Sequence, residues 1–150
     1  MKIIVRCIGK EKDTASLYWC KEYIKRTPWK INFEELPSSQ KINVDEIKEE
    51  EAKNLLSKVT TTSYLIALDE SGVEMRSVEF SDFLTSISKT NKEITFFIGG
   101  AYGLSENLKK KCNKLVSLSM MTLPHKMVRM FLSEQLYRAY TISTKHPYHK

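Results

Sequence analysis

The strongest constraint on the fold of this chain is a set of short apolar segments separated by amphipathic ones. Lys2–Ile8, Tyr64–Leu68 and Ile94–Ile98 are rich in β-branched and aromatic residues, and each is too short for a helix of ordinary length. Nearly continuous apolar runs of this length are typical of strands that are covered on both faces of a sheet. Two further strands are expected at Ile31–Leu36 and Leu115–Leu118.

Helix signals fill the segments between these strands. Helices are expected from Asp13 to about Arg26, from Asn43 or Asp45 to about Val59, over Ser77–Lys89, over Ser105–Cys112 and from Pro124 to about Thr141. We interpret the many glutamates and lysines of the second helix as a solvated face. Strands that alternate with helices predict an α/β fold, with a mainly parallel sheet of five or six strands and helices on both faces. With 150 residues and no visible repeat or linker, a single domain over residues 1–150 is expected.

The composition limits the partners and the compartment. The formal net charge of +6 favours an anionic partner such as RNA, although many lysine-rich proteins share this property. No apolar run approaches the ~18 residues that a membrane-spanning helix needs, and Arg6 interrupts the short apolar start, which is unlike a signal peptide. Three scattered cysteines fit a reducing cytoplasm, and neither they nor the histidines have the spacing of a metal site. We therefore expect a cytoplasmic protein with no membrane contact and no metal.

A cluster of glycines follows the fourth expected strand, in the sequence FFIGGAYG at Phe96–Gly103. A dinucleotide fold would place G-x-G-x-x-G after the first strand, and no phosphate-binding loop ending in Gly-Lys-Ser or Gly-Lys-Thr is present, so NAD and ATP sites are not expected. The glycines serve either a tight turn alone or the approach of the main chain to a ligand. Their place at a strand's carboxyl end favours the ligand, because the ends at Leu68 and Leu118 can converge there.

Four motifs carry a specific resemblance. They are I-G-G-x-x-G-L at residues 98–104, S-x-M-T-L-P-H at 119–125, E-Q-L-Y-R-A at 134–139 and the terminal Y-H-K at 148–150. Together they closely resemble the small SPOUT-class methyltransferases, specifically the family of large-subunit ribosomal RNA pseudouridine N3-methyltransferases. The resemblance covers essentially the whole chain.

This resemblance implies properties that spacing alone does not show. It implies a C-terminal deep trefoil knot, an exception to the rule that protein chains are unknotted. It also implies a homodimer that uses S-adenosylmethionine to methylate N3 of a pseudouridine in 23S ribosomal RNA, acting on assembled ribosomes. The residues it assigns to the methyl-donor pocket are Leu68, Gly99, Leu118, Ser119, Met120, Met121, Thr122 and Leu123. Gly99 is expected to let the main chain approach the donor.

Catalytic candidates follow from the same resemblance, which places the tail near the active site. N3 of pseudouridine must lose a proton before or during attack, so a general base or an anion-stabilising cation would help. Glu134 and His149 are alternative bases, Arg138 is the candidate cation, and Tyr148 suits stacking on a base. The basic residues expected to hold RNA include Arg6, Lys10, Lys12, Arg129 and the tail.

The last helix has two apolar sides. One side is expected to pack in the core and carries Val128, Phe131, Leu132, Gln135, Leu136 and Ala139. The other is expected to form a two-fold interface and carries Met127, Met130, Glu134, Tyr137, Arg138 and Thr141. Two other functions remain open from the sequence: a non-catalytic RNA-binding module of the same fold, and a monomeric methyltransferase of the Rossmann type.

Overall fold

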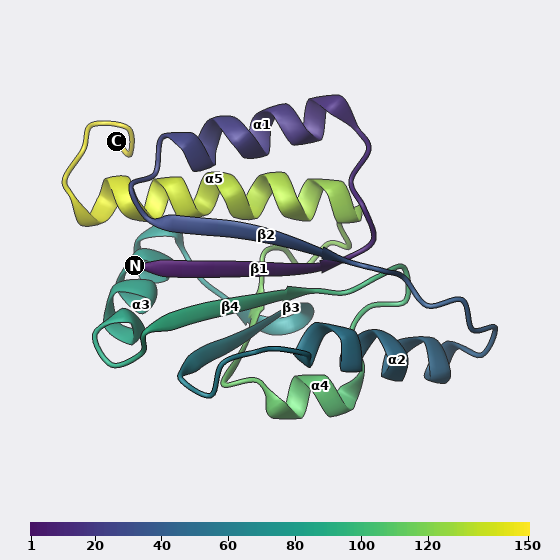
Figure 1. Ribbon diagram of the computed structural model, residues 1–150. Helices are drawn as coiled ribbons and strands as arrows, with labels where there is room; N and C mark the ends of the chain where they lie inside the picture. Colours follow the sequence, from purple (N-terminus) through teal and green to yellow (C-terminus); the bar gives the residue numbers. More distant parts are fainter.

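A computed structural model describes residues 1–150 as a five-stranded sheet with five helices (Figure 1). In chain order the elements are β1 (Lys2–Ile8), α1 (Thr14–Lys25), β2 (Lys30–Leu36), α2 (Val44–Leu56), β3 (Ser63–Glu74), α3 (Ser77–Ser88), β4 (Glu93–Ile98), α4 (Glu106–Lys111), β5 (Lys114–Ser117) and α5 (His125–Ser143). The strand order is β2-β1-β4-β3-β5, and every pairing of neighbours is parallel. The α/β fold with a parallel sheet is thus confirmed.

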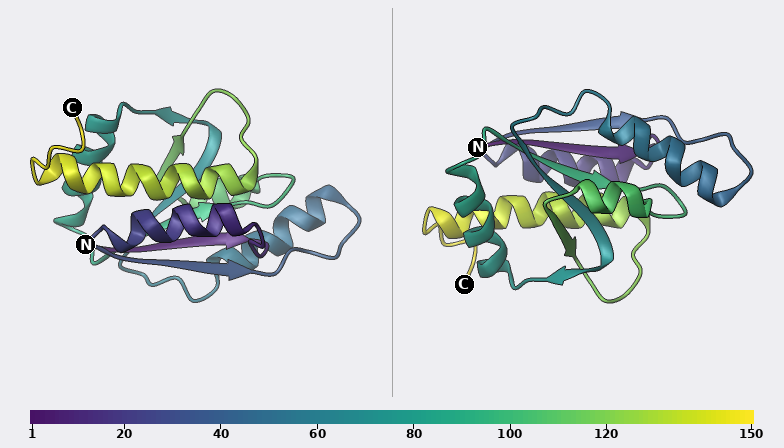
Figure 2. Two further views of the ribbon diagram at one scale, coloured as in Figure 1. Left: turned by 90° about the horizontal axis from the view of Figure 1, so that it is seen from above. Right: turned by 90° about the horizontal axis from the view of Figure 1, so that it is seen from below.

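Helices cover both faces of the sheet, and each face has its own core. α1, α3 and α5 cover one face and α2 and α4 the other, as the views in Figures 1 and 2 show. Alternation along β4 divides the side chains, so that Phe96 joins the first core and Phe97 the second. Both rings are fully buried, which explains why β4 is apolar at nearly every position.

Local capping fixes the helix starts where the sequence indicated them. The Asp13 carboxylate accepts a hydrogen bond from the Ser16 N–H at 2.9 Å, and Asn43 and Ser105 cap α2 and α4 in the same way. α5 begins directly after Pro124 and continues to Ser143, two residues beyond its expected end. None of the five helices combines the length and the apolar character that crossing a membrane requires.

The third strand was expected to end at Leu68, but it continues to Glu74, so this expected end was wrong. β3 shifts register between Leu68 and Val73, and Val116 in β5 pairs with both of these residues. Both halves of β3 thus contact β5, and residues 69–72 form the bend between them. A Cβ on Gly72 would lie 2.6 Å from the main chain of Val116, so only glycine fits this bend.

Strand β5 therefore lies inside the bend of β3, and residues 118–124 lead from it to α5. Figure 2 shows β3 curving around the short strand β5 before the chain continues to α5. This enclosure is consistent with the C-terminal knot that the resemblance implies.

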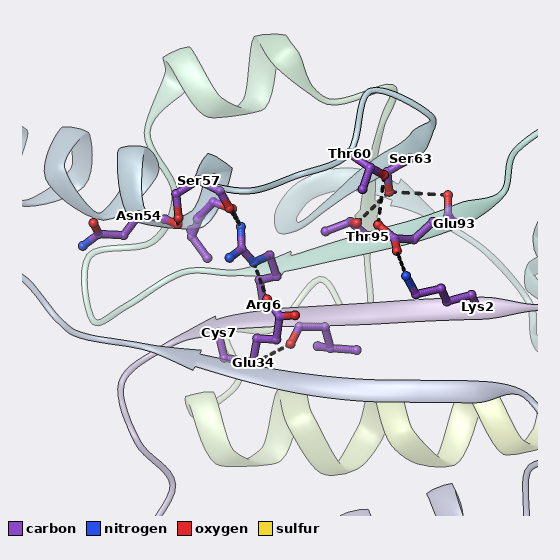
Figure 3. Close-up of polar contacts among 12 residues, drawn as sticks. Lys2, Arg6, Cys7, Glu34, Asn54, Ser57, Thr60, Ser63, Glu93 and Thr95 are labelled. Atoms are coloured by element: carbon purple, nitrogen blue, oxygen red, sulfur yellow. Dashed lines mark hydrogen bonds and ion pairs between the residues drawn. The ribbon is translucent and has the colours of Figure 1, made fainter.

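Two arginines expected at an RNA surface are buried inside the domain instead. Arg6 is 5% exposed; its guanidinium donates to Glu34 at 2.9 Å and to the carbonyl oxygens of Leu55 and Ser57 (Figure 3). Arg129 is 3% exposed and is paired with Glu35 at 2.5 Å. The expectation that these two arginines hold RNA was wrong, because a buried, paired guanidinium is not available to phosphate.

The two sides of α5 also differ from the expected ones. α1 packs along α5 and α3 packs on its other side, so Tyr137 and Thr141 are buried within the chain. Phe131, expected in the core, is 42% exposed. The sequence could not show that α1 would cover part of the second side. The outward stripe of α5 consists of Met127, Met130, Phe131, Glu134, Gln135 and Arg138.

Candidate active site

A cleft of about 740 Å³ opens at the carboxyl ends of β4 and β5, beside the bend of β3. Three separate segments supply most of its lining, namely residues 68–71, 98–104 and 117–125. They come together because parallel strands that lie side by side end at the same edge of the sheet. The volume lies in the range of ordinary ligand pockets.

The residues assigned to the donor pocket from sequence gather at this cleft, with one exception. Leu68, Gly99, Leu118, Ser119, Met121, Thr122 and Leu123 all line it. Met120 is 82% exposed and lies outside the lining.

The glycines are required by the loop itself, which corrects the reason given for Gly99. A Cβ on Gly99 would lie 2.7 Å from the carbonyl carbon of Gly103, and one on Gly100 would lie 2.7 Å from Oε2 of Glu51. Gly103 has φ +76°, in the left-handed region that favours glycine, and its N–H donates to the Gly100 carbonyl at 3.0 Å. The missing side chains of Gly99 and Gly100 thus leave room for protein atoms, while the loop forms one wall of the cleft.

An ion pair that sequence reasoning missed lies at the rim. Lys109 of α4 contacts Asp69 at 2.7 Å and Glu106 at 3.1 Å. Burial alone would raise the pKa of Asp69, but hydrogen bonds from Lys109 and Ser71 outweigh it and hold that pKa below its usual value. Asp69 therefore stays ionised at neutral pH. Its position directly after Leu68, where the sequence predicted the carboxyl end of the third strand, was the signal that could have found it.

His125 is a second lining residue that was not assigned a role from sequence. It opens α5, and its Nε2 atom is buried without a hydrogen-bond partner. Burial lowers the pKa of His125 and the nearby Arg129 lowers it further, against smaller opposing effects of Glu11 and Glu35. The ring is therefore neutral at pH 7 and can exchange a hydrogen bond with a ligand in the cleft.

The four catalytic candidates form one cluster on α5 and the tail. Oε1 of Glu134 accepts from Arg138 through Nη2 at 2.5 Å and Nε at 2.9 Å, and from the Tyr148 hydroxyl at 3.1 Å. The Arg138 guanidinium lies over the Tyr148 ring at 4.8 Å, and its Nη1 is 3.3 Å from Nδ1 of His149. The tail is thus held by contacts between side chains.

Electrostatics fix the protonation of two members of this cluster. Burial raises the pKa of Tyr148, and hydrogen bonds with Tyr23 and Glu134 raise it further, so the phenol keeps its proton. The hydrogen bond with Glu134 raises the pKa of Arg138, which stays cationic. Because guanidinium nitrogens only donate, Nδ1 of His149 is the acceptor of its contact with Arg138.

Within one chain this cluster does not reach the cleft. Arg138 lies thirteen residues after His125, which corresponds to ~20 Å along a helix axis. Figure 1 shows the start of α5 and the C-terminal tail at opposite ends of this helix. The structure thus brings the pocket residues together and the catalytic candidates together, in two separate places. The described chain contains no cluster of three or more potential metal ligands.

Comparison with known proteins gives consistent matches over the whole chain. A family model described as "Predicted SPOUT methyltransferase" matches residues 1–149. The chain is 41% identical over 155 residues to the ribosomal RNA large subunit methyltransferase H of Campylobacter fetus, with 100% of both chains covered. It is 39% identical over 160 residues to the protein of the same name from Streptococcus uberis, again with full coverage of both.

A solved structure is similar at a much lower level. It is the crystal structure of the SpoU methyltransferase AviRb from Streptomyces viridochromogenes in complex with AdoMet, at 12% identity and a TM-score of 0.43. The match covers 92% of this chain and 59% of that one. At this TM-score the likeness carries no argument about the cleft.

Proposed function

The chain belongs to the SPOUT methyltransferase family, and from this premise we propose that it methylates 23S ribosomal RNA with S-adenosylmethionine as methyl donor. The proposed target atom is N3 of a pseudouridine. The observation that carries the proposal is the cleft, because three segments that are far apart in sequence line it together, and two of them contain motifs of the family.

The residues of the cleft fit the donor chemically. Leu68, Leu118 and Leu123 supply apolar walls suited to an adenine ring, and the strand ends supply main-chain polar groups. Asp69 carries a negative charge and Lys109 a positive charge at the rim, which suits the zwitterionic amino-acid part of S-adenosylmethionine. When bound, S-adenosylmethionine supplies an electrophilic methyl group on a sulfonium, so the main task of the protein is alignment.

On the acceptor side we assign the leading role to Arg138. Both oxygens of Glu134 already accept hydrogen bonds, Oε1 from Arg138 and Tyr148 and Oε2 from Gln135, and Nδ1 of His149 already faces Arg138. These contacts support a role for Glu134 in holding Arg138. A cation beside N3 would stabilise the anion that forms when its proton leaves to water. Glu134 then orients Arg138, and Tyr148 offers a ring on which the target base can stack.

A homodimer would bring the two halves of the site together. The outward stripe of α5 begins with exposed apolar residues, Met127 at 45% and Phe131 at 42% exposure, and continues to Glu134 and Arg138. Two copies that pack this stripe in opposite directions would place the tail of one near the cleft of the other. This second copy is the partner that we propose for the stripe.

We further propose that the substrate is the assembled ribosome in the cytoplasm. A preformed target would supply the shape that guides binding. Lys10 and Lys12, both exposed, and the tail are the remaining candidates of the original set for contact with phosphate.

The decisive experiment is methyl transfer to ribosomes from cells that lack this modification, with mass spectrometry of the modified nucleotide. N3-methylpseudouridine in 23S RNA is expected, and naked 23S RNA should be a poor substrate. Calorimetry with S-adenosylmethionine tests the alternative in parallel. A protein that binds ribosomes but not the donor would be a non-catalytic RNA-binding module, and the proposal would be rejected.

A further inference from the structure

One glutamate of α2 is buried, although the other acidic residues of this helix are at least partly exposed. Ile47, Glu51 and Leu55 follow one another at four-residue spacing and form the stripe that faces the core. Glu51 is only 4% exposed. The interpretation of all the acidic residues of this helix as a solvated face was therefore wrong for Glu51.

The Glu51 carboxylate lies directly behind the glycine loop of the cleft. Its Oε1 accepts a hydrogen bond from the Ser39 N–H at 3.1 Å, and its Oε2 is buried without any partner. A Cβ on Gly100 would lie 2.7 Å from Oε2 and 3.1 Å from Oε1. The carboxylate thus fills the space that a side chain at position 100 would need.

An unpaired, buried carboxylate oxygen is energetically unfavourable, so a partner for it is expected in some state of the protein. No cation forms an ion pair with Glu51. The main chain of the glycine loop lies close to Oε2, as the position of a Cβ on Gly100 shows. Gly100 is bridged to Gly103, whereas the Ala101 N–H donates to no protein atom. An oxygen without a donor thus lies beside a loop with one unused donor.

We propose that Glu51 is a positioning residue for the methyl-donor pocket. When the donor fills the cleft, Oε2 accepts a main-chain hydrogen bond from the Gly100–Ala101 segment and fixes the loop against the ligand from behind. Glu51 does not line the cleft, so it acts through the loop and has no contact with the donor. This inference rests on the proposed function, because it takes the cleft to be the donor site.

The chemistry of this position requires a carboxylate. Both groups that face Glu51, the Ser39 N–H and the loop N–H, are donors, so the side chain must accept at both ends. Glutamine has the same shape, but its NH₂ group would face one of the two donors. Methionine has a similar size but is only a weak hydrogen-bond acceptor. It also removes the buried carboxylate, and this removal favours the folded state.

The test compares Glu51→Gln and Glu51→Met with the wild type in calorimetric titrations with S-adenosylmethionine and in thermal unfolding. Glu46→Gln serves as the control, because it makes the same chemical change at an exposed position of the same helix. We expect the dissociation constant of the donor to rise about 10- to 100-fold in both Glu51 variants, the effect of losing one hydrogen bond to a charged group. Thermal stability should stay equal or rise in Glu51→Met. The control should bind as the wild type does.

If the Glu51 carboxylate only stabilises the fold, a different result is expected. Glu51→Met would then lose stability, whereas Glu51→Gln would keep wild-type affinity, and the proposal would be overturned. Wild-type affinity in both Glu51 variants overturns it as well. As a spectroscopic readout, the amide proton of Ala101 should move downfield on donor binding in the wild type and not in Glu51→Gln; no shift in the wild type counts against the proposal. A wild-type protein that fails to bind the donor would instead reject the proposed function.

Discussion

At the scale of single residues, burial decides what each polar group at the cleft can do. His125 is held neutral because its ring is largely out of water and close to Arg129. Asp69 is also partly buried, yet it stays ionised because Lys109 and Ser71 donate to it. The two groups can therefore play different roles in one cleft: a neutral hydrogen-bonding ring and a fixed negative charge.

The lowered pKa of His125 predicts a pH-dependent stability. In the unfolded chain its pKa is near the ordinary value of 6.5, and in the folded protein it lies lower, so the unfolded state binds the proton first. The neutral ring makes its full contribution to the free energy of unfolding above pH 6.5, and this contribution is lost as the pH falls through the folded-state pKa.

Melting temperatures between pH 8 and pH 5 check this prediction against His125→Gln, which cannot titrate. The wild type should lose several degrees relative to the variant as the pH drops below 6.5. Parallel pH profiles of the two proteins would mean that His125 is not the group responsible.

At the scale of the elements, local patterns predicted more than long-range pairing. The apolar run Ile94–Ile98 and the cap at Asp13 are local signals, and the structure has a strand and a helix there. The continuation of β3 past Gly72 could not be predicted, because it depends on Val116, more than forty residues later. The burial of Tyr137 depends in the same way on α1. Most cleft residues were found from the resemblance of sequence motifs, whereas Glu51 and Lys109 come from helices whose orientation only the fold determines.

The bend of β3 around β5 predicts that replacing two glycines by alanine will lower the free energy of unfolding by unequal amounts. A methyl group at Gly72 would lie 2.6 Å from the main chain of Val116, which cannot move without breaking the pairing of β5. Gly103 has open space at the same position, so alanine there meets only the strain of a positive φ, ~1 kcal/mol.

Gly72→Ala should therefore lower the free energy of unfolding by about 3 kcal/mol or more, clearly beyond Gly103→Ala. Denaturant unfolding measures this difference, provided that the two variants have equal m-values. Equal losses in both would show that β3 does not enclose β5 as tightly as the structure has it.

At the scale of the whole molecule, the length of α5 separates the cleft from the catalytic candidates. The outward stripe between them is apolar near Met127 and Phe131 and charged near Glu134 and Arg138. A second copy in the opposite direction would cover the apolar part and bring the charged part to the other cleft. The dimer is thus a requirement of the proposed chemistry as well as a way to bury apolar surface.

The double variant Met127→Glu and Phe131→Glu tests this interface. In a two-fold contact each new charge would be buried near its symmetry mate, so the dimer should dissociate at micromolar concentration. Ile42→Glu is the control, since Ile42 is 97% exposed on a different part of the surface. Light scattering should show a monomer for the double variant and a dimer for the control. A dimeric double variant would place the interface elsewhere.

The proposed dimer predicts that each active site is shared between two chains. Gly99→Val disables the cleft, because its Cβ would meet the main chain of Gly103 at 2.7 Å. Deletion of residues 147–150 removes Tyr148 and His149 and leaves the cleft intact. Each variant alone should be inactive in methyl transfer to ribosomes.

After subunit exchange, half of the dimers contain one chain of each kind, and each of these has one intact cleft facing one intact tail. Mixing the two inactive variants should therefore restore about a quarter of the wild-type activity, since one site of two is complete in half of the dimers. If each site were built within one chain, no mixed dimer would have a complete site. Exchange is verified by mass spectrometry of differently tagged chains. Absence of activity in a verified mixture would show that the cleft and the tail of the same chain work together, and a movement of the tail over ~20 Å would then be needed.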